Sequence, residues 1–382
     1  MTAAFDPHTH LPDHLLERIR SRAEETDRAN VFPDADLEEL RAAGYLSILV
    51  PADLGGAGVG LEQASILQQR LATAAPATAL AVNMHLVWTA VAKILRERGD
   101  DALEFVQRGS ADGRVYAFGI SEPDNDLVLF GSTTDAVPSG GGYAFTGTKI
   151  FTSLAPVWTS LGVHGLDSSD PDSPRLVFAF LDGRDGVVTR DDWDTVGMRG
   201  SQSRTTELHA ATAPAERVVR TLSLESAPDV LQFGIFAAFE LLLASVYAGI
   251  ACRAIELAAA AVSARTSLKT GAPRREDPLV RARIGGMAID YDGIALELAA
   301  LTRDLDDAVD HGARWFGLLS GMKHRAVTVA ARIVDEALVA AGGSSFRNAS
   351  ELSRLSRDVR AGIFHPSSPD SARQTAAAAW LD

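Results

Sequence analysis

The feature that most limits how this chain can fold is the long apolar run Val230–Cys252, in which Glu240 is the only formally charged residue. A run of this length can cross a bilayer. No basic cluster flanks it, however, and the segments that follow have the helical period of a soluble bundle. We therefore expect a helix buried inside a helical bundle and no membrane partner.

Helical patterns on both sides of a β-rich middle divide the chain into three parts. We expect an N-terminal helical domain over residues 1–115, a middle antiparallel β-barrel or sandwich over 116–225, and a C-terminal four-helix bundle over 226–382. The fold class is α+β, with most residues in helices. The bundle helices are expected at Asp229–Leu268, Asp277–Ala308, Gly312–Ala341 and Ser350–Ile363.

Charge and cysteine content exclude several classes of function. The formal net charge of −14 disfavours a nucleic-acid or anionic-membrane partner. The single Cys252 rules out an internal disulfide, and no basic region leads into an apolar one at the N-terminus, so we expect a cytoplasmic protein. His8, His10 and His14 have a metal-like spacing but lie in a polar tail, and we expect no metal site.

Four short segments carry a family resemblance that covers nearly the whole chain. They are Tyr116–Pro123, Thr146–Ser153, Trp193–Ser201, and the C-terminal stretch with the Gly342-Gly343 turn and the Arg357-Asp358 pair. In this order and at these separations they resemble the acyl-CoA dehydrogenase superfamily. The resemblance implies an acyl-CoA dehydrogenase-like fold, a flavin cofactor, and a homodimer or homotetramer that shares its flavin across subunits.

The first two segments supply what a flavin ring requires, a flat apolar wall and a few hydrogen-bonding groups. By the resemblance, the wall and the hydroxyls come from Phe118, Ile120, Ser121, Phe151, Thr152 and Ser153. The same residues can also be ordinary members of strand cores. The sequence leaves both interpretations open.

The resemblance also places the adenosine diphosphate half of FAD. Arg265 follows the first long bundle helix, and an Arg fork suits a pyrophosphate. Gly342 and Gly343 permit close backbone approach, although a Gly-Gly turn is equally a helix cap. Ser368 falls where family members contact the adenosine half.

One departure from the family pattern concerns the catalytic base. Dehydrogenases of this family carry a glutamate about eight residues after the Asp of the Arg-Asp pair, where this chain has Pro366 beside His365. Other members carry the base on the first long bundle helix, and Glu240 lies one residue from that position. A shift of one residue turns a helical side chain by about 100°. Glu240 is therefore either a base or a structural partner for an Arg.

A second departure weakens the case for coenzyme A. Dehydrogenases usually continue after Glu-Pro with a Gly-Ser-Asp motif, whereas this chain has Asp124-Asn125-Asp126-Leu127. Flavin-dependent monooxygenases of the same superfamily, such as the dibenzothiophene monooxygenase type and the oxygenases of two-component hydroxylases, lack the dehydrogenase glutamate. They use a His in the Arg-Asp loop, a Ser on the flavin strand and often a His on an N-terminal helix.

This chain offers His365, Ser153 and His85 in those three places, so we expect them to be catalytic. A neutral imidazole or a hydroxyl can hydrogen-bond a flavin oxygen adduct and relay a proton. We expect the substrate to contact Asn83, Trp88 and Phe239. The alternatives are a satisfied core histidine for His85, a helix cap for His365 and a backbone contact for Ser153.

The lead hypothesis is a monooxygenase that hydroxylates a small apolar or aromatic molecule through a C4a-hydroperoxide. Its flavin is FAD or is supplied as FADH2 or FMNH2 by a separate flavin reductase. The first alternative is an FAD-dependent acyl-CoA dehydrogenase that uses Glu240. The second is a catalytically degenerate subunit that supports an active partner chain.

Overall fold

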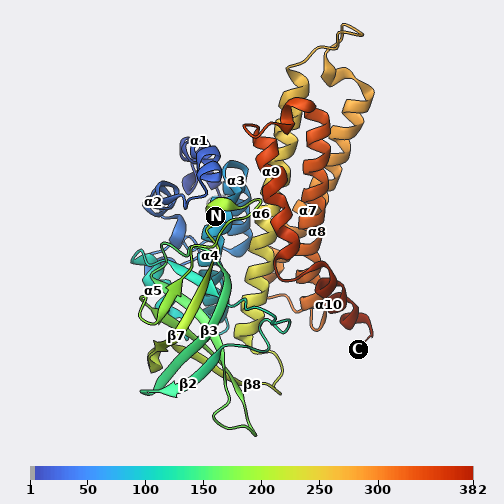
Figure 1. Cartoon of the computed structure of the whole chain (residues 1–382). Helices are drawn as coiled ribbons and strands as arrows, with labels where there is room; N and C mark the ends of the chain where they lie inside the picture. Colours follow the sequence, from blue (N-terminus) through green and yellow to red (C-terminus); the bar gives the residue numbers. More distant parts are fainter. Residues whose placement is uncertain (1–4, 382) are drawn as a thin grey trace.

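The chain forms two helical regions with a β-sheet between them (Figure 1). The computed structural model describes residues 5–381. In Figure 1 the N-terminal helices and the sheet lie on one side of the long helix α6, and the C-terminal helices lie on the other. The expected order of helical, β and helical parts is confirmed.

The N-terminal region consists of five α-helices and short connecting turns. The helices are α1 (Asp13–Ala29), α2 (Asp34–Ala42), α3 (Leu61–Ala74), α4 (Pro76–Glu97) and α5 (Glu104–Ala111). Pro76 opens α4 at a position where its missing N–H costs nothing. Helix α4 is buried almost all round, so it has no polar face turned to solvent.

The middle region is an eight-stranded sheet in the order β6-β7-β3-β2-β4-β5-β8, with β1 paired to β4. The strands are β1 (Tyr116–Gly119), β2 (Asp135–Ser139), β3 (Gly142–Thr152), β4 (Ser160–Asp167), β5 (Arg175–Asp182), β6 (Val187–Thr189), β7 (Arg204–Ala213) and β8 (Val218–Ser223). The expectation of a wholly antiparallel sheet is wrong, because β4 pairs in parallel with both β1 and β2. A long connection follows β1 instead of a hairpin, so β1 and β4 can run in the same direction.

The C-terminal region is built on three long helices. Its helices are α6 (Val230–Ser263), α7 (Pro278–Asp306), α8 (Arg314–Ala341), α9 (Glu351–Asp358) and α10 (Pro369–Leu381). The expected helix Ser350–Ile363 is shorter, since α9 ends at Asp358 and the chain continues as a 3-10 segment, Val359–Phe364. This segment leads into the loop that carries His365.

Helix α6 contains the apolar run and lies at the centre of the molecule. Asp229 caps its N-terminus by accepting a hydrogen bond from the Leu231 N–H at 2.8 Å. Helices α4 and α6 are long and apolar enough to cross a membrane, but 94% and 83% of their apolar windows are buried inside the protein. The expectation that Val230–Cys252 lies in a buried bundle helix is therefore confirmed.

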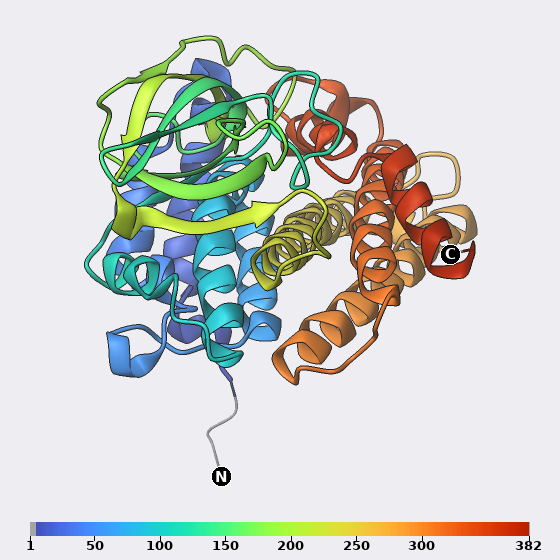
Figure 2. The same cartoon turned by 90° about the horizontal axis from the view of Figure 1, so that it is seen from below.

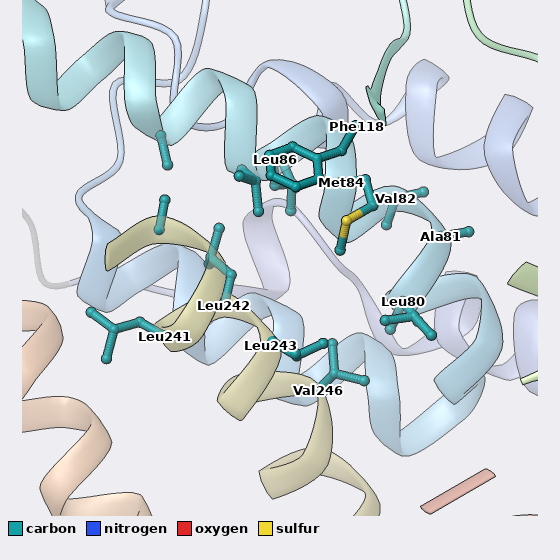
Figure 3. Close-up of a cluster of buried hydrophobic side chains, with 14 of the residues drawn as sticks. Leu80, Ala81, Val82, Met84, Leu86, Phe118, Leu241, Leu242, Leu243 and Val246 are labelled. Carbon is teal, nitrogen blue, oxygen red and sulfur yellow. The ribbon is translucent and has the colours of Figure 1, made fainter. Parts of the chain in front are cut away.

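The contact between α4 and α6 joins the two halves of the molecule. Figure 2 shows α6 between the sheet-covered N-terminal helices and the pair α7 and α8. Side chains of both helices, among them Met84 and Leu243, gather with Phe118 in one apolar cluster (Figure 3). Phe118 belongs to β1, so helices and sheet share a core at this point.

Candidate active site

A cavity of about 630 Å³ lies where the sheet, α4, α6 and the segment after α9 meet. We call it the larger cavity. Its lining residues are Leu80, Met84, Phe118, Ser121, Phe151, Ser153, Trp193–Met198, Ser203, Phe239, Arg357, Arg360, Ala361, Phe364, His365 and Pro366. The volume is in the range of pockets that hold cofactors or drug-sized ligands.

Two aromatic rings on the sheet side form an exposed corner of this cavity. The Phe151 ring is perpendicular to the Trp193 ring, with centroids 6.3 Å apart. Phe151 is 51% exposed and has a φ of 56°, which is unfavourable for a residue other than glycine. Strained backbone of this kind is often found at binding sites. The sequence contained Trp193 in a family segment, but we did not predict it as a site residue.

Three serine hydroxyls form a short chain beside these rings. Ser153 Oγ lies 2.7 Å from Ser203 Oγ, which lies 2.8 Å from Ser201 Oγ. Ser153 and Ser203 line the larger cavity. Thr152, on the alternate face of β3, is fully buried and does not line it. The structure therefore does not place the Thr152 hydroxyl, which we expected to face the flavin, in this cavity.

His365 lines the same cavity from the loop that follows the 3-10 segment Val359–Phe364. Its Nε2 lies 3.3 Å from the Tyr247 hydroxyl, and its main-chain carbonyl accepts a hydrogen bond from Lys323 Nζ at 2.7 Å. Burial, and then the positive charge of Lys323, lower the pKa of His365 to about 3. The imidazole is therefore neutral near pH 7.

Two buried charged side chains anchor the loop that carries His365. Lys323 Nζ, from α8, donates to the carbonyls of Gly362 at 2.9 Å, His365 at 2.7 Å and Ser367 at 2.7 Å. Glu240 Oε1, from α6, accepts from the Ser367 N–H at 2.9 Å and the Ser367 hydroxyl at 2.6 Å. We call these two residues the loop anchor. The Arg partner that the sequence suggested for Glu240 is replaced by Ser367 and Lys323.

The Arg357-Asp358 pair joins the C-terminal region to the N-terminal and middle regions. Asp358 is buried and accepts a hydrogen bond from the Met198 N–H at 2.6 Å. Arg357 donates to Asp27 Oδ1 on α1 at 2.9 Å. A side chain at Gly197 would meet the Arg357 carbonyl at 2.3 Å, so this close approach needs glycine. Burial raises the pKa of Asp358 to about 6.

A second cavity, of about 280 Å³, adjoins the first and is called the smaller cavity. The two share Phe118, Ser121, Phe239 and Pro366 as lining residues. Ile120 and Glu240 line only the smaller one. The larger cavity therefore brings together six of the residues we predicted: Phe118, Ser121, Phe151, Ser153, Phe239 and His365. Two more, Ile120 and Glu240, line the adjoining smaller cavity.

His85 is not brought to either cavity. Its Nδ1 accepts a hydrogen bond from the Tyr116 N–H at 3.1 Å, and its Nε2 lies 2.7 Å from the Leu46 carbonyl and 3.1 Å from Ser110 Oγ. Burial lowers its pKa to about 4, so the ring is neutral. The expectation of a catalytic His85 is corrected to a satisfied core histidine, because neither ring nitrogen is free.

The two other α4 residues that we expected at the substrate are also in the core. The Trp88 Nε1–H donates to the Ala117 carbonyl at 2.9 Å, and Asn83 Oδ1 accepts from Gln68 Nε2 at 2.6 Å. Neither lines the larger or the smaller cavity; Leu80 and Met84 supply the α4 part of the larger cavity's lining. The apolar pattern of α4 runs all round the helix, so it could not show which face meets a cavity.

The residues expected at the adenosine half of FAD lie away from both cavities. Arg265 follows the C-terminal end of α6, roughly 35 Å along the helix from Phe239. Arg265 donates to the Ala341 carbonyl and, at 2.8 Å, to Ser344 Oγ beside the Gly342-Gly343 turn. Ser368 is exposed and lies 3.1 Å from Ser371 Oγ at the start of α10. A role toward a neighbouring subunit's flavin stays a prediction.

The larger cavity has the properties that a flavin ring requires. It offers apolar and aromatic surfaces from Phe118, Phe151 and Trp193, and it offers the hydroxyls of Ser153 and Ser203. Its volume and donor set therefore fit a flavin ring. Through these side chains the protein can orient the ring and supply hydrogen bonds to its polar edge.

Family models match two long parts of the chain. Residues 12–103 match the model for the N-terminal domain of acyl-CoA dehydrogenase, and residues 241–368 match the model for its C-terminal domain. Together they cover more than half of the sequence. The chain belongs to the acyl-CoA dehydrogenase superfamily.

Similar proteins of this superfamily cover almost the full chain. Dibenzothiophene monooxygenase from Rhodococcus qingshengii is 29% identical over 92% of this chain and 88% of that protein. Amino sugar nitrososynthase RubN8 from Streptomyces rubradiris is 27% identical over 93% and 84%. The putative acyl-CoA dehydrogenase YdbM from Bacillus subtilis is 25% identical over 94% and 92%.

Solved structures give the same fold. The nitrososynthase from Micromonospora carbonacea var. africana has a TM-score of 0.87 at 25% identity, covering 100% of this chain and 98% of that chain. Butyryl-CoA dehydrogenase from Megasphaera elsdenii has a TM-score of 0.85 at 17% identity, covering 100% of both chains, and shows the fold alone. The acyl-CoA dehydrogenase fold, the class of flavin-dependent oxidoreductase and the flavin cofactor, all expected from the sequence, are thereby confirmed.

Proposed function

We propose that this superfamily member is a monooxygenase that uses reduced flavin to oxidise a small, largely apolar molecule. The observation that carries the proposal is that neutral His365 faces the larger cavity from the loop in which dehydrogenases of the family carry their base. This imidazole can donate or accept a hydrogen bond, but because burial lowers its pKa to about 3 it is a weak base toward a carbon acid.

The charges around the larger cavity agree with this assignment. Among the described lining residues, the only carboxylate is Asp194, whose side chain is 90% exposed and lies 3.1 Å from Arg199. A base that removes a proton from carbon works best when burial raises its pKa and no cation holds its charge. Asp194 is exposed and paired with a cation, so the described lining of this cavity lacks a conventional dehydrogenase base.

Each chain residue then has a definite task. Bound reduced flavin supplies the activation of oxygen. Ser153 and His365 both line the larger cavity, where they can hold polar atoms and pass a proton, while the loop anchor fixes the position of His365. The apolar side chains of Leu80, Met84 and Phe239 exclude water and accept an apolar substrate.

The relatives support oxygen chemistry at a bound flavin. Two of the similar proteins are named as monooxygenase and nitrososynthase, and the KijD3 structure with a TM-score of 0.86 contains FMN. We infer that FMNH2 or FADH2 is delivered by a separate flavin reductase. We also infer a homodimer or homotetramer, in which Arg265 and Ser368 of one subunit serve the flavin of another.

The decisive experiment is rapid mixing of the reduced, flavin-loaded protein with oxygenated buffer. We expect a transient absorbance band that appears before the spectrum of oxidised flavin. Direct formation of oxidised flavin without a transient band, or no reaction with oxygen, would contradict the proposal. Because the observable is the flavin itself, the test needs no knowledge of the substrate.

The variant His365→Ala tests the role of the loop histidine. We expect the coupled product yield to fall at least about 100-fold, the usual contribution of one acid–base group, while flavin binding persists. His324→Ala on α8 is the matched control, since His324 is half-buried and lines neither cavity. Product yields within twofold of each other for the two variants would remove His365 from the mechanism.

The rival function is dehydrogenation of an acyl-CoA with Glu240 as base. Burial raises the pKa of Glu240 to about 7, which suits a base. Against this role, Oε1 is already bonded to Ser367, and Glu240 lines only the smaller cavity. A panel of acyl-CoA thioesters mixed with the oxidised protein would decide, because bleaching of the flavin by any of them would favour the rival.

A further inference from the structure

The smaller cavity has an unusual distribution of charge. It lies between residues 126–130, α6 and the start of α10, and its walls are mainly apolar, including Ile235, Phe236 and Phe239. Among the described lining residues the charged side chains are Asp126 and Glu240, and no Lys or Arg lines it. The described wall therefore carries carboxylates and no cation, and the charge of Lys323 acts on Glu240 from outside the lining.

Glu240 has one oxygen that nothing in the described part of the chain satisfies. Its side chain is only 1% exposed, Oε1 accepts two hydrogen bonds from Ser367, and Oε2 has no partner. A buried carboxylate oxygen without a partner is costly. Such an atom in a cavity wall indicates a missing hydrogen-bonding group.

Lys323, the cation next to Glu240, cannot supply that group. An ammonium has three N–H donors, and Lys323 uses them on the carbonyls of Gly362, His365 and Ser367. Its charge acts on Glu240 through space, but no proton remains for Oε2. No described residue therefore supplies a hydrogen bond to Oε2.

We propose that the smaller cavity binds the substrate of the proposed monooxygenase, and that Glu240 Oε2 receives the amino group of an otherwise apolar molecule. The inference rests on the proposed function only in calling the ligand a substrate. An ammonium group provides both the hydrogen bond and the positive charge that this wall lacks. The remainder of the molecule contacts Phe236 and Phe239.

The position of the cavity suits a substrate. It shares Phe118, Ser121, Phe239 and Pro366 with the larger cavity, so a ligand anchored at Glu240 reaches the wall next to the flavin. About 280 Å³ accommodates a ring with a short side chain, and not a coenzyme A ester. The anionic pyrophosphate of coenzyme A would also meet two carboxylates.

The proposal is tested by equilibrium binding to the oxidised, flavin-loaded protein at pH 8, without reductant. The probes are 2-phenylethylamine and propylbenzene, which have nearly the same shape but differ in the terminal amine. Burying an ammonium without a partner is unfavourable, so an ordinary apolar pocket would prefer the hydrocarbon. We expect the opposite, with the amine bound at least tenfold more tightly by the wild-type protein.

The variant Glu240→Gln assigns the effect to one atom. Glutamine can still accept from Ser367 through its carbonyl, while its NH2 replaces Oε2 and opposes an amine. We expect the variant to bind 2-phenylethylamine at least tenfold more weakly and propylbenzene within twofold of wild type. Asp124→Asn, at an exposed residue that lines neither cavity, is the matched control, and we expect it to change amine affinity less than threefold.

Three results would overturn the proposal. They are equal or tighter binding of propylbenzene by the wild type, an unchanged amine affinity in Glu240→Gln, and a loss in Asp124→Asn as large as that in Glu240→Gln. The wild-type comparison remains decisive if a variant does not fold. Binding is measured without turnover, so the affinities of the two probes can be interpreted even if the protein is not an oxygenase.

Discussion

The described part of the chain buries two lysine–glutamate pairs, one in the sheet and one beside the loop that carries His365, and they are built differently. In the sheet, Lys149 Nζ lies 2.5 Å from Glu122 Oε1 and also donates to the His164 carbonyl at 2.7 Å. Both Glu122 oxygens accept further hydrogen bonds, from Asn125, Ser132, Thr133 and Thr134. In the loop anchor, Lys323 bonds only carbonyls, and Glu240 keeps one oxygen free.

The difference separates a structural charge from one available for function. In the sheet pair, the positive charge of Lys149 and several hydrogen bonds outweigh burial and hold the pKa of Glu122 well below its ordinary value. Glu240 has fewer partners, so burial dominates and raises its pKa to about 7. A buried acid with its hydrogen bonds complete stabilises the fold, whereas an incomplete one can still bind a proton or a ligand.

Removal of Lys149, the lysine of the sheet pair, should have the largest effect on stability. Lys149→Met leaves Glu122 charged and unpaired in the core, and we expect a loss of about 3–5 kcal/mol in the free energy of unfolding. Denaturant titration measures it. The double variant Lys149→Met with Glu122→Gln should recover part of the loss. A loss below about 1 kcal/mol in the single variant would remove the contrast between the pairs.

Removal of the loop lysine should cost less, because Glu240 can take up a proton instead of remaining charged. We expect Lys323→Met to lose about 2–3 kcal/mol, chiefly from three carbonyls without donors. The same variant should lose at least tenfold in coupled product yield, since the position of His365 is no longer fixed. Urea titration and product assays measure both quantities. Full coupling in a folded variant would show that the anchor does not position His365.

Neutralising Glu240 should have the smallest effect, and one that depends on pH. The pKa of this group rises from 4.5 when unfolded to about 7 when folded, so the folded state binds the extra proton between these values. The wild type therefore loses stability at this site as the pH rises from about 4.5 to 7. As the pH rises from 5 to 7.5, the free energy of unfolding of Glu240→Gln should increase relative to that of wild type by on the order of 2 kcal/mol. Urea titrations at both pH values measure the gain, and parallel stability curves for the two proteins would contradict it.

The order of helices, sheet and bundle could be predicted because periodicity reports which elements form. Periodicity predicted both the helix formed by the apolar run, α6, and the strand that carries Phe118, β1. Strand direction was not, since the parallel pairing of β1 and β4 depends on a long connection and not on a local pattern. His365 was singled out by its distance from Arg357-Asp358, a spacing that the family resemblance supplied, and it lines the larger cavity.

Residues whose role depends on packing were not predictable. His85 and Trp88 lie on the right helix, but α4 is buried on every side, and only the packed structure shows that Met84 meets the cavity. Lys323 was missed, although one signal was present, namely a lone lysine among the apolar positions Leu319, Met322 and Ala326 of α8. An isolated charge on an apolar helix face can mark a functional anchor, as Glu240 also does.

The stacked rings of Phe118 and Phe239, with centroids 5.5 Å apart, form a partition shared by the two cavities. One ring belongs to the sheet and the other to α6. A mutation at Phe239 can therefore enlarge the room for substrate while Phe118 keeps its place beside the flavin. In evolutionary terms, substrate range can change at a single position of the partition without rebuilding the larger cavity.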